Sequence, residues 1–304
     1  MNILRSMSIV ALALAVTACS TIPVNLPSVA SNGGSAALPG KVIWHDLLTD
    51  TPEQTRRFYS ELFGWSFEAL DGEGGEYTLI RSNGELVGGM VNQLQLPTTA
   101  DISQWVTVLA VRDAETAADA LLDAGGTVFT PPTSLGARGT IAVVADPQGA
   151  VLALLQTDGH DPQDTGGPVA TGTFLWDELW ATDVAAATDF YQRMAPFEVN
   201  QIDFEVADHN IIYRVLSSQG RPRAGIRPNP VPEMGPMWVN YLRIDDLASM
   251  KAIVARVPAL DGEVLSPPTR RPEGGYVAVI AGPSGAGIAL QTWPLQADLA
   301  NRSQ

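Results

Sequence analysis

Two short segments of this chain place a carboxylate two residues after a tryptophan: Trp44-His45-Asp46-Leu47 and Trp176-Asp177-Glu178-Leu179. Alternate side chains of a β-strand share one face, so the indole and the carboxylate of each segment would lie side by side. A carboxylate next to an aromatic ring suits a cationic or aromatic ligand. Both segments are therefore candidates for binding a small molecule.

One of these carboxylates could also transfer protons. If indole rings enclose Glu178, the loss of water would raise its pKa and allow it to act as a general acid or base. The sequence offers no competing arrangement, because its only cysteine is Cys19 and it contains neither a Gly-x-Ser-x-Gly motif nor a Walker motif. Glu178 is thus the one candidate catalytic residue.

The composition limits the class of partner. The chain has 304 residues, of which 45% are hydrophobic, and this allows two domains with packed cores. Its formal net charge of -15 argues against nucleic acid as a partner, because phosphates require a basic surface. The acidity instead favours solubility. With one cysteine, no disulfide can form within the chain.

Residues 1–18 have the pattern of a bacterial lipoprotein signal peptide. Arg5 precedes an apolar run too short to span a bilayer, and Val16-Thr17-Ala18 supplies small residues before Cys19. The pattern predicts that acyl chains such as palmitate on Cys19 hold the protein in the lipid bilayer. Ser20, rather than an aspartate, favours the outer membrane and the periplasm. The alternative is an ordinary signal peptide with a chance cysteine.

The body of the chain repeats one plan four times. Each unit opens with a strand that starts at a tryptophan, and these starts are Trp44, Trp105, Trp176 and Trp238. In the first unit Thr51 and Gln54 predict a capping box at a helix start, and Gly64 predicts the helix end. Asn83-Gly84 predicts a tight hairpin. The repeat as a whole predicts the order β-α-β-β-β in every unit.

Composition shifts predict the boundaries between the parts of the mature chain. Segments rich in Ser, Pro, Gly and Asp read as tethers or linkers, whereas the repeated units read as folded domains. The predicted parts are a flexible tether at 19–40, a first domain at 41–157, a linker at 158–170, a second domain at 171–293 and a tail at 294–304.

These motifs, taken in order, resemble the vicinal oxygen chelate superfamily, which includes glyoxalase I, extradiol dioxygenases and bleomycin-resistance proteins. Besides the four unit starts, the matching residues are Phe58-Tyr59, Phe63-Gly64-Trp65 and Asp146-Pro147-Gln148-Gly149. The resemblance covers about residues 41–293 and is closest to the tandem-domain glyoxalase-like subgroup. It implies an α+β fold in which four βαβββ units pair into two domains, each with a curved sheet around a cup.

In the superfamily's metalloenzymes the cup holds a divalent metal, bound by side chains of the first and last strands. Counting from the shared motifs places Trp44 and Trp176 at first-strand ligand positions, and Ala153 and Ala289 at last-strand positions. An indole nitrogen only donates hydrogen bonds, and alanine has no ligand atom. His45 is expected to be a satisfied residue of the sheet. The resemblance therefore implies cups without the usual metal, and no cofactor is expected.

Each cup is expected to combine two indoles with a few polar groups, as small-molecule pockets do. The expected ligand-binding residues are Trp44, Asp46, Tyr77, Trp105 and Thr107 in the first cup, and Trp176, Glu178, Tyr213, Trp238 and Asn240 in the second. The alternative is that the tryptophans fill the cups as plain core. Arg138 and Arg271 occupy matching loops and are expected to face solvent, with the cup rim as the alternative.

Three classes of function follow. The leading hypothesis is a membrane-anchored glyoxalase-like protein that binds a small molecule in metal-free cups. The second is an enzyme of the superfamily, of the lyase, isomerase or dioxygenase type. The third is a structural lipoprotein with occluded cups. An open cup that contains Asp46 or Glu178 would favour binding over the structural role.

Overall fold

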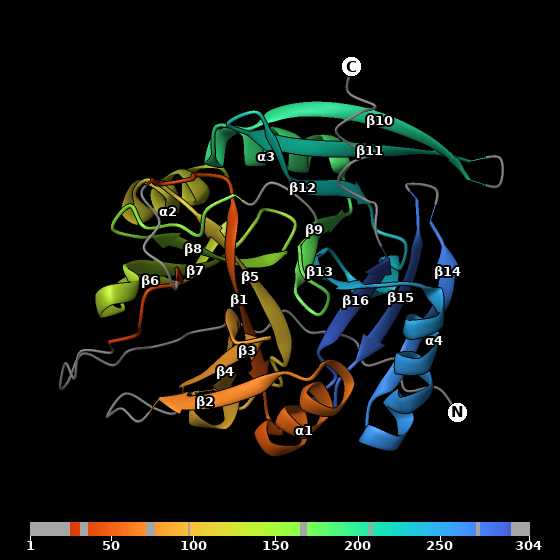
Figure 1. Ribbon diagram of the computed structural model, residues 1–304. Coiled ribbons are helices and arrows are strands. Elements are labelled where there is room, and N and C mark those ends of the chain that lie inside the picture. The colour runs from red at the N-terminus through yellow and green to blue at the C-terminus, as the bar shows by residue number, and fades with distance from the viewer. Residues whose placement is uncertain are drawn as a thin grey trace.

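The computed structural model describes residues 25–30, 36–70, 77–96, 98–164, 169–206, 209–271 and 274–292. Helices and strands follow the predicted order β-α-β-β-β four times (Figure 1). Two successive units build one eight-stranded mixed sheet, so the predicted α+β class with two domains of one design is confirmed. No helix within the described ranges is long and apolar enough to cross a bilayer. The signal peptide, Cys19 and the tail lie outside the described residues.

The first sheet has the strand order β2-β3-β4-β1-β5-β8-β7-β6, so the opening strands of its two units are neighbours at its centre. The first unit contains β1 (Val42–Thr49), α1 (Pro52–Phe63), β2 (Ser66–Leu70), β3 (Tyr77–Ser82), β4 (Glu85–Asn92) and the short 3-10 helix η1 (Gln93–Gln95). The second unit contains β5 (Gln104–Ala110), α2 (Ala114–Asp123), β6 (Thr127–Ser134), η2 (Gly136–Arg138), β7 (Thr140–Ala145) and β8 (Val151–Gln156).

The second sheet repeats this arrangement in the order β10-β11-β12-β9-β13-β16-β15-β14. The third unit contains β9 (Phe174–Ala181), α3 (Val184–Met194), β10 (Glu198–Val206), β11 (His209–Ser218), β12 (Arg221–Pro228) and η3 (Pro232–Met234). The fourth contains β13 (Met237–Ile244), α4 (Leu247–Arg256), η4 (Val257–Leu260), β14 (Glu263–Arg270), β15 (Tyr276–Ala281) and β16 (Gly287–Thr292).

Local signals explain where the helices begin and end. The side chains of Asp113 and Asp183 accept hydrogen bonds from backbone N–H groups three residues ahead and so cap α2 and α3. Gly64 ends α1 in the left-handed conformation, with φ 69°. The predicted capping box of α1 is wrong, because the Thr51 side chain makes no capping hydrogen bond. The backbone N–H of Thr51 instead donates to the Thr49 hydroxyl at 3.1 Å.

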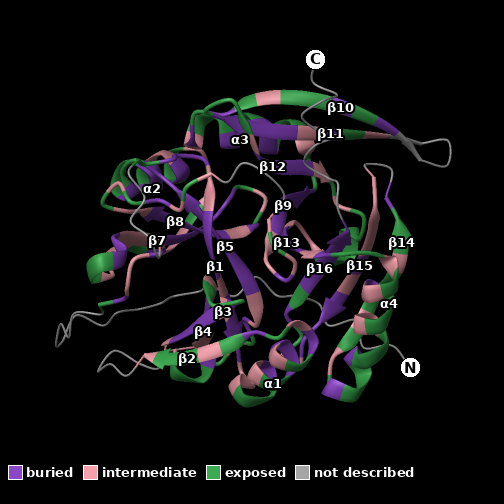
Figure 2. Cartoon of the chain, in the orientation of Figure 1, coloured by how far each residue is buried: buried purple, intermediate pink, exposed green. Residues whose placement is uncertain are grey.

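The two sheets pack together through their helix-covered faces. One buried cluster joins α2 of the first domain with α3 of the second, and another joins α1 with α4 and η4. The opposite faces carry two further apolar clusters, one in each domain, which contain Trp44 and Trp176 respectively. Buried residues accordingly fill the central strands of both sheets (Figure 2). Each sheet therefore has an inner face that lines its own cup and an outer face that contacts the other domain.

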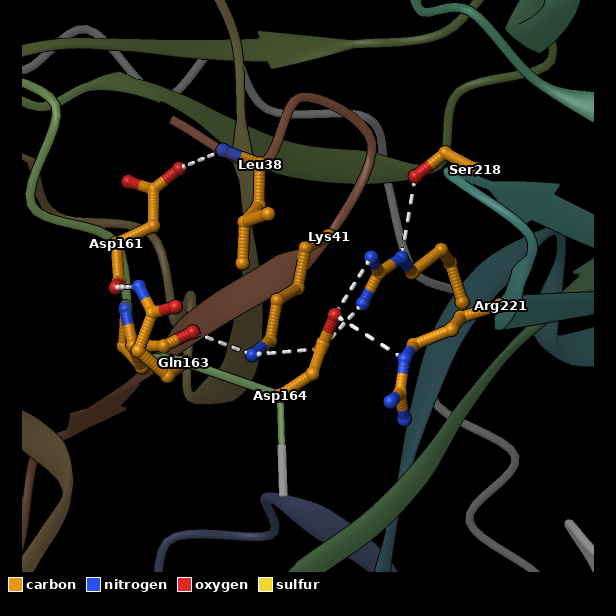
Figure 3. Close-up of polar contacts among 9 residues, drawn as sticks. Leu38, Lys41, Asp161, Gln163, Asp164, Ser218 and Arg221 are labelled. Carbon is orange, nitrogen blue, oxygen red and sulfur yellow. Dashed lines mark hydrogen bonds and ion pairs between the residues drawn. The ribbon is translucent and has the colours of Figure 1, made fainter. Parts of the chain in front are cut away.

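Charged side chains hold the segment between the domains against both of them (Figure 3). Asp164 accepts a hydrogen bond from Arg223 at 2.6 Å and forms an ion pair with Lys41 at 3.1 Å. Burial would raise the pKa of Asp164, but its bonds to Arg223 and Lys41 outweigh burial and lower that pKa to about 2. Asp161 accepts the backbone N–H of Leu38 at 2.5 Å. This segment thus fixes the entry into β1 as well as β12.

Candidate functional site

The first cup contains a cluster of four hydrogen-bonded side chains. The Trp44 indole donates to Asp46 Oδ1 at 3.0 Å and to the Tyr77 hydroxyl at 2.9 Å. Tyr77 in turn donates to Asp46 Oδ1 at 2.5 Å. Arg138 Nη1 donates to the Tyr77 hydroxyl at 2.6 Å. The fold therefore brings together three of the expected residues of this cup and adds an arginine to them.

A glycine on the neighbouring strand makes room for this cluster. In the parallel pair of β1 and β4, Asp46 lies opposite Gly89. A Cβ atom at Gly89 would overlap both the Tyr77 hydroxyl and the Asp46 carboxylate. The second domain has the same device, because Gly225 of β12 pairs with β9 and a Cβ there would overlap the Tyr213 hydroxyl. Glycine thus lets a tyrosine reach across one strand to the carboxylate.

Arg138 was expected to face solvent, but it is buried in the cup. Its exposed fraction is 2%, and its guanidinium carbon lies 4.6 Å from the Trp44 ring centroid and 4.9 Å from that of Tyr77. Nε donates to the Pro27 carbonyl at 3.0 Å, whereas Nη2 has no hydrogen-bond partner. The reason is the turn after η2, where Gly139, with φ 111°, packs tightly against the backbone at the end of β8 and folds the loop inward.

Part of the predicted tether covers the first cup. The backbone N–H of Leu26 donates to the Leu135 carbonyl at 2.9 Å. Val29 is 4% exposed and belongs to the apolar cluster of the cup. Residues 25–30 are therefore packed against the first domain, which corrects the expectation of a flexible tether throughout 19–40. The physical reason is that this stretch contains apolar side chains that the mouth of the cup can bury.

The second cup contains the same cluster of side chains, with additional hydrogen bonds to its carboxylate. The Trp176 indole donates to the Tyr213 hydroxyl, and Tyr213 donates to Glu178 Oε1, both at 2.8 Å. Arg271, also expected at the surface, is 4% exposed and donates from Nη2 to Glu178 Oε1 at 2.7 Å. Tyr241 donates to Glu178 Oε2 at 2.5 Å. Both carboxylate oxygens are thus satisfied from within the domain.

These partners reverse the expected titration of Glu178. Burial alone would raise its pKa, but the positive charges of Arg271 and Arg227 and the hydrogen bond from Tyr241 outweigh burial and lower the pKa to about 2. The predicted rise in the pKa of Glu178 is therefore wrong, since the carboxylate stays ionised and paired. Burial and the adjacent carboxylate raise the pKa of Tyr213, which keeps it a protonated donor.

The two cups differ in how far their polar groups are accessible. Glu178 is fully buried, whereas Asp46 and Tyr77 are only partly buried. One cause is a substitution opposite the first-strand tryptophan, where the first cup has Val108 and the second has Tyr241. The smaller side chain supplies no hydroxyl to close the site. The Asp46 carboxylate of the first cup therefore keeps part of its surface exposed, and the second cup encloses its own carboxylate.

Four of the expected residues lie on the outer faces of the sheets and not in the cups: Trp105, Thr107, Trp238 and Asn240. In the antiparallel pair of β1 and β5, Trp44 lies opposite Val108, and Thr107 lies opposite His45. Opposed residues share a face, so Thr107 faces outward with His45. The expected grouping of two first-strand indoles in each cup is wrong because a shift of one residue between paired strands exchanges the faces.

Two of these four residues join the domains. The Asn240 amide donates to the Thr107 hydroxyl and to Asp177 Oδ1, both at 2.7 Å. His45 Nε2 lies 2.8 Å from the same Asp177 oxygen, and its ring stacks on Phe174 with centroids 3.6 Å apart. His45 is thus a bonded residue of the sheet, as predicted, and its partner lies across the domain interface.

The duplicated Phe-Tyr motif binds the two outward-facing tryptophans. Trp105 donates to the Tyr59 hydroxyl at 2.9 Å, and Trp238 donates to the Tyr191 hydroxyl at 3.0 Å. Tyr191 also donates to Asp146 at 3.1 Å, in the turn that precedes β8 of the first domain. Packing between helix, sheet and the neighbouring domain explains this pair of tryptophans.

Neither cup has the side chains that the superfamily's metal requires. The aligned central positions are Trp44, Val108 and Ala153 in the first cup and Trp176, Tyr241 and Ala289 in the second. Structural and catalytic metal sites are built from Cys, His, Asp or Glu. In the described part of the chain, no three such side chains lie close enough together to hold a metal ion. The residues present therefore do not fit that metal.

The prediction of site residues missed the glycines and placed the arginines wrongly. Gly89 and Gly225 give no signal in a single sequence, because their role depends on a tyrosine of the neighbouring strand that reaches past them to a carboxylate on the next strand. Arg138 and Arg271 do give a signal in the sequence. The number of residues between them is nearly the same as that between the equivalent tryptophans of the two halves. Loop residues that recur in both halves of a duplicated chain are candidates for a shared position in the cup.

Comparison with known proteins finds glyoxalase-like sequences that are similar to this chain. Residues 43–155 match the family described as glyoxalase-like domain. The Mycobacterium tuberculosis protein named "Putative glyoxylase CFP32" is 29% identical over 250 residues, which are 80% of this chain and 91% of that protein. "Anthracycline biosynthesis protein DauV" of Streptomyces sp. strain C5 is 28% identical over 281 residues, which are 86% and 97% of the two chains.

Solved structures with the same fold include a glyoxalase and a dioxygenase. The Mn(II)-bound glyoxalase from Novosphingobium aromaticivorans superposes with a TM-score of 0.54 at 13% identity, covering 85% of this chain and 83% of that one. A variant of homoprotocatechuate 2,3-dioxygenase from B. fuscum gives a TM-score of 0.57 at 15% identity, covering 88% and 74%. At these identities the likeness concerns the fold.

Proposed function

We propose that this chain is a member of the vicinal oxygen chelate superfamily whose first glyoxalase-like domain binds a small organic molecule in a metal-free cup. The observation that carries the proposal is the partly exposed, hydrogen-bonded pair of Asp46 and Tyr77 beside the Trp44 ring. A largely apolar cup with a few polar anchors has the composition of a ligand site. The second cup, which is closed by its own side chains, supports a structural role for the second domain.

Each residue of the first cup has a distinct part in this proposal. The Trp44 and Tyr77 rings, which lie against Arg138, would form the aromatic wall of the site, and Asp46 offers a carboxylate that can accept a hydrogen bond from the ligand. Burial and the neighbouring Asp46 raise the pKa of Tyr77, so the phenol remains a donor throughout the physiological range. The names of the relatives, a glyoxylase and a protein of anthracycline biosynthesis, fit a role with small organic molecules.

A thermal-shift screen tests the proposal with a panel of aromatic acids, phenols and aromatic amines. At least one compound should stabilise the wild-type protein, and Tyr77→Phe should remove that stabilisation. Tyr213→Phe is the matched control, because it deletes the equivalent hydroxyl of the enclosed cup and should leave the ligand effect intact. No stabilisation by any compound, or equal losses in both variants, would contradict binding in the first cup.

The same geometry favours an enzyme as the second candidate. Asp46 could accept a proton from a bound ligand while the buried guanidinium of Arg138 stabilises the resulting anion, as a lyase or isomerase requires. NMR in D2O tests this candidate by following exchange of carbon-bound protons of a ligand identified in the screen. Exchange that is lost in Asp46→Asn would support catalysis, and the absence of exchange in the wild type would leave binding alone.

We also propose that Cys19 carries the lipid that holds the protein at the periplasmic side of the outer membrane. The support is the signal pattern of residues 1–18 together with the small residues before Cys19. Labelling with a palmitate analogue and membrane fractionation test the proposal. Cys19→Ser should lose both the label and the membrane association, and recovery of unlabelled wild-type protein in the soluble fraction would refute the anchor.

A further inference from the structure

Arg138 carries a buried positive charge that no described carboxylate pairs with directly. Its exposed fraction is 2%, and no ion pair joins it to an Asp or Glu among the described residues. Nη1 donates to Tyr77 and Nε to Pro27, both neutral acceptors, and Nη2 has no partner. Withdrawing a cation from water without a counter-charge is costly. A buried guanidinium with one N–H group that has no acceptor can bind an anion there.

The second cup shows which group completes the arrangement. There, Arg271 donates to the Glu178 carboxylate at 2.7 Å, and the same carboxylate accepts from Tyr213. The first cup has Asp46 at the position of Glu178, and its side chain is one methylene shorter. Asp46 reaches the tyrosine but makes no ion pair with Arg138. What the first cup lacks is therefore one carboxylate next to Nη2.

We infer that the first cup binds the carboxylate of an organic acid, which pairs with Arg138 as Glu178 pairs with Arg271. The inference rests on the proposed function and names the chemical class of its ligand. Because the Trp44 and Tyr77 rings lie within 5 Å of the guanidinium carbon, an aromatic acid places its ring among aromatic neighbours. Nε already donates a hydrogen bond to the Pro27 carbonyl. The ligand carboxylate would therefore accept its hydrogen bond from Nη2.

Two probes of the same shape separate charge from aromatic contact. Isothermal titration of the full chain with 2-naphthoate and with the neutral 2-naphthamide should show at least about tenfold tighter binding of the acid, as a charge-assisted hydrogen bond provides. Arg138→Gln should abolish this preference. Equal affinities in the wild type, or a preserved preference in the variant, would overturn the inference.

If neither probe binds, the inference of an aromatic acid fails, whereas a different compound whose stabilising effect depends on Tyr77 would leave the proposed function standing.

A second variant gives the first cup its own internal carboxylate. Asp46→Glu reproduces the residue found in the second cup, so its carboxylate should pair with Arg138, raise the melting temperature and weaken 2-naphthoate binding by about tenfold or more. Asp189→Glu, at an exposed position on α3, is the control and should change neither quantity. A lower melting temperature with unchanged naphthoate affinity in Asp46→Glu would refute the assignment of Nη2 as the anion site.

Discussion

Removing the charge of Glu178 should destabilise the second domain far more than the equivalent change in the first. Glu178 Oε1 and Arg271 Nη2 lie 2.7 Å apart, and the two residues are 0% and 4% exposed. Glu178→Gln removes the carboxylate to which the buried guanidinium donates, and breaking a buried pair of this kind costs about 3–5 kcal/mol of unfolding free energy. For a domain of this size that loss lowers the melting temperature by about 6–20 °C. Asp46→Asn, at the partly exposed counterpart, should cost about 1 kcal/mol.

The change of stability with pH tests the same prediction independently. The pKa of Glu178 is lowered from 4.5 to about 2 in the folded protein, so its contribution is complete above pH 4.5 and is lost as the pH falls toward 2. The difference in unfolding free energy between wild type and Glu178→Gln should therefore be constant near neutral pH and shrink over that acid range.

Urea unfolding, followed by tryptophan fluorescence and circular dichroism at several pH values, measures both effects. The double variant Glu178→Gln/Arg271→Met should recover much of the lost stability, because it also removes the buried guanidinium whose carboxylate partner is gone. A loss below about 1 kcal/mol for the single variant, or no recovery in the double variant, would show that the buried pair does not stabilise the domain as argued.

Three further changes probe the cup, its cover and the domain interface. Gly89→Ala should displace Tyr77, abolish 2-naphthoate binding and cost about 1–3 kcal/mol in urea unfolding, and unchanged binding would contradict the role of this glycine. The double variant Leu26→Ser/Val29→Ser should loosen the covering segment and tighten 2-naphthoate binding, whereas Leu94→Ser, at a side chain that is 71% exposed, should not change it. His45→Ala should cost about 1–3 kcal/mol by leaving Asp177 short of a partner, and a change within experimental error would show that the interface does not depend on this contact.

The fold was predictable because its signals are local and repeated. The turn that contains Gly64, the Asp caps and the duplicated tryptophan starts each depend on a few neighbouring residues, and the tryptophan starts and helix caps recur at similar offsets. Four repeats of one weak pattern specify the order of elements, and the order of elements specifies the paired sheets.

The composition of the cups was only partly predictable because it depends on how strands pair. Alternation within β1 correctly places Trp44 beside Asp46, since it involves one strand. Whether Trp105 shares that face depends on the register between β1 and β5, which the local pattern does not contain. The predicted direction of the Glu178 pKa shift was wrong for a similar reason. Arg271, which lowers that pKa, reaches Glu178 from a loop that lies 93 residues further along the chain.

The covering segment also sets the distance between the first cup and any membrane to which the chain is attached. Only about six residues lead from Cys19 to Asn25, where the described contacts with the first domain begin. An extended chain spans about 3.5 Å per residue, so a lipid on Cys19 would hold the mouth of this cup within about 20 Å of the bilayer surface. The protein would then lie close to the lipid with its first domain nearest to it, and molecules dissolved in the headgroup layer would meet that cup before they meet the periplasm.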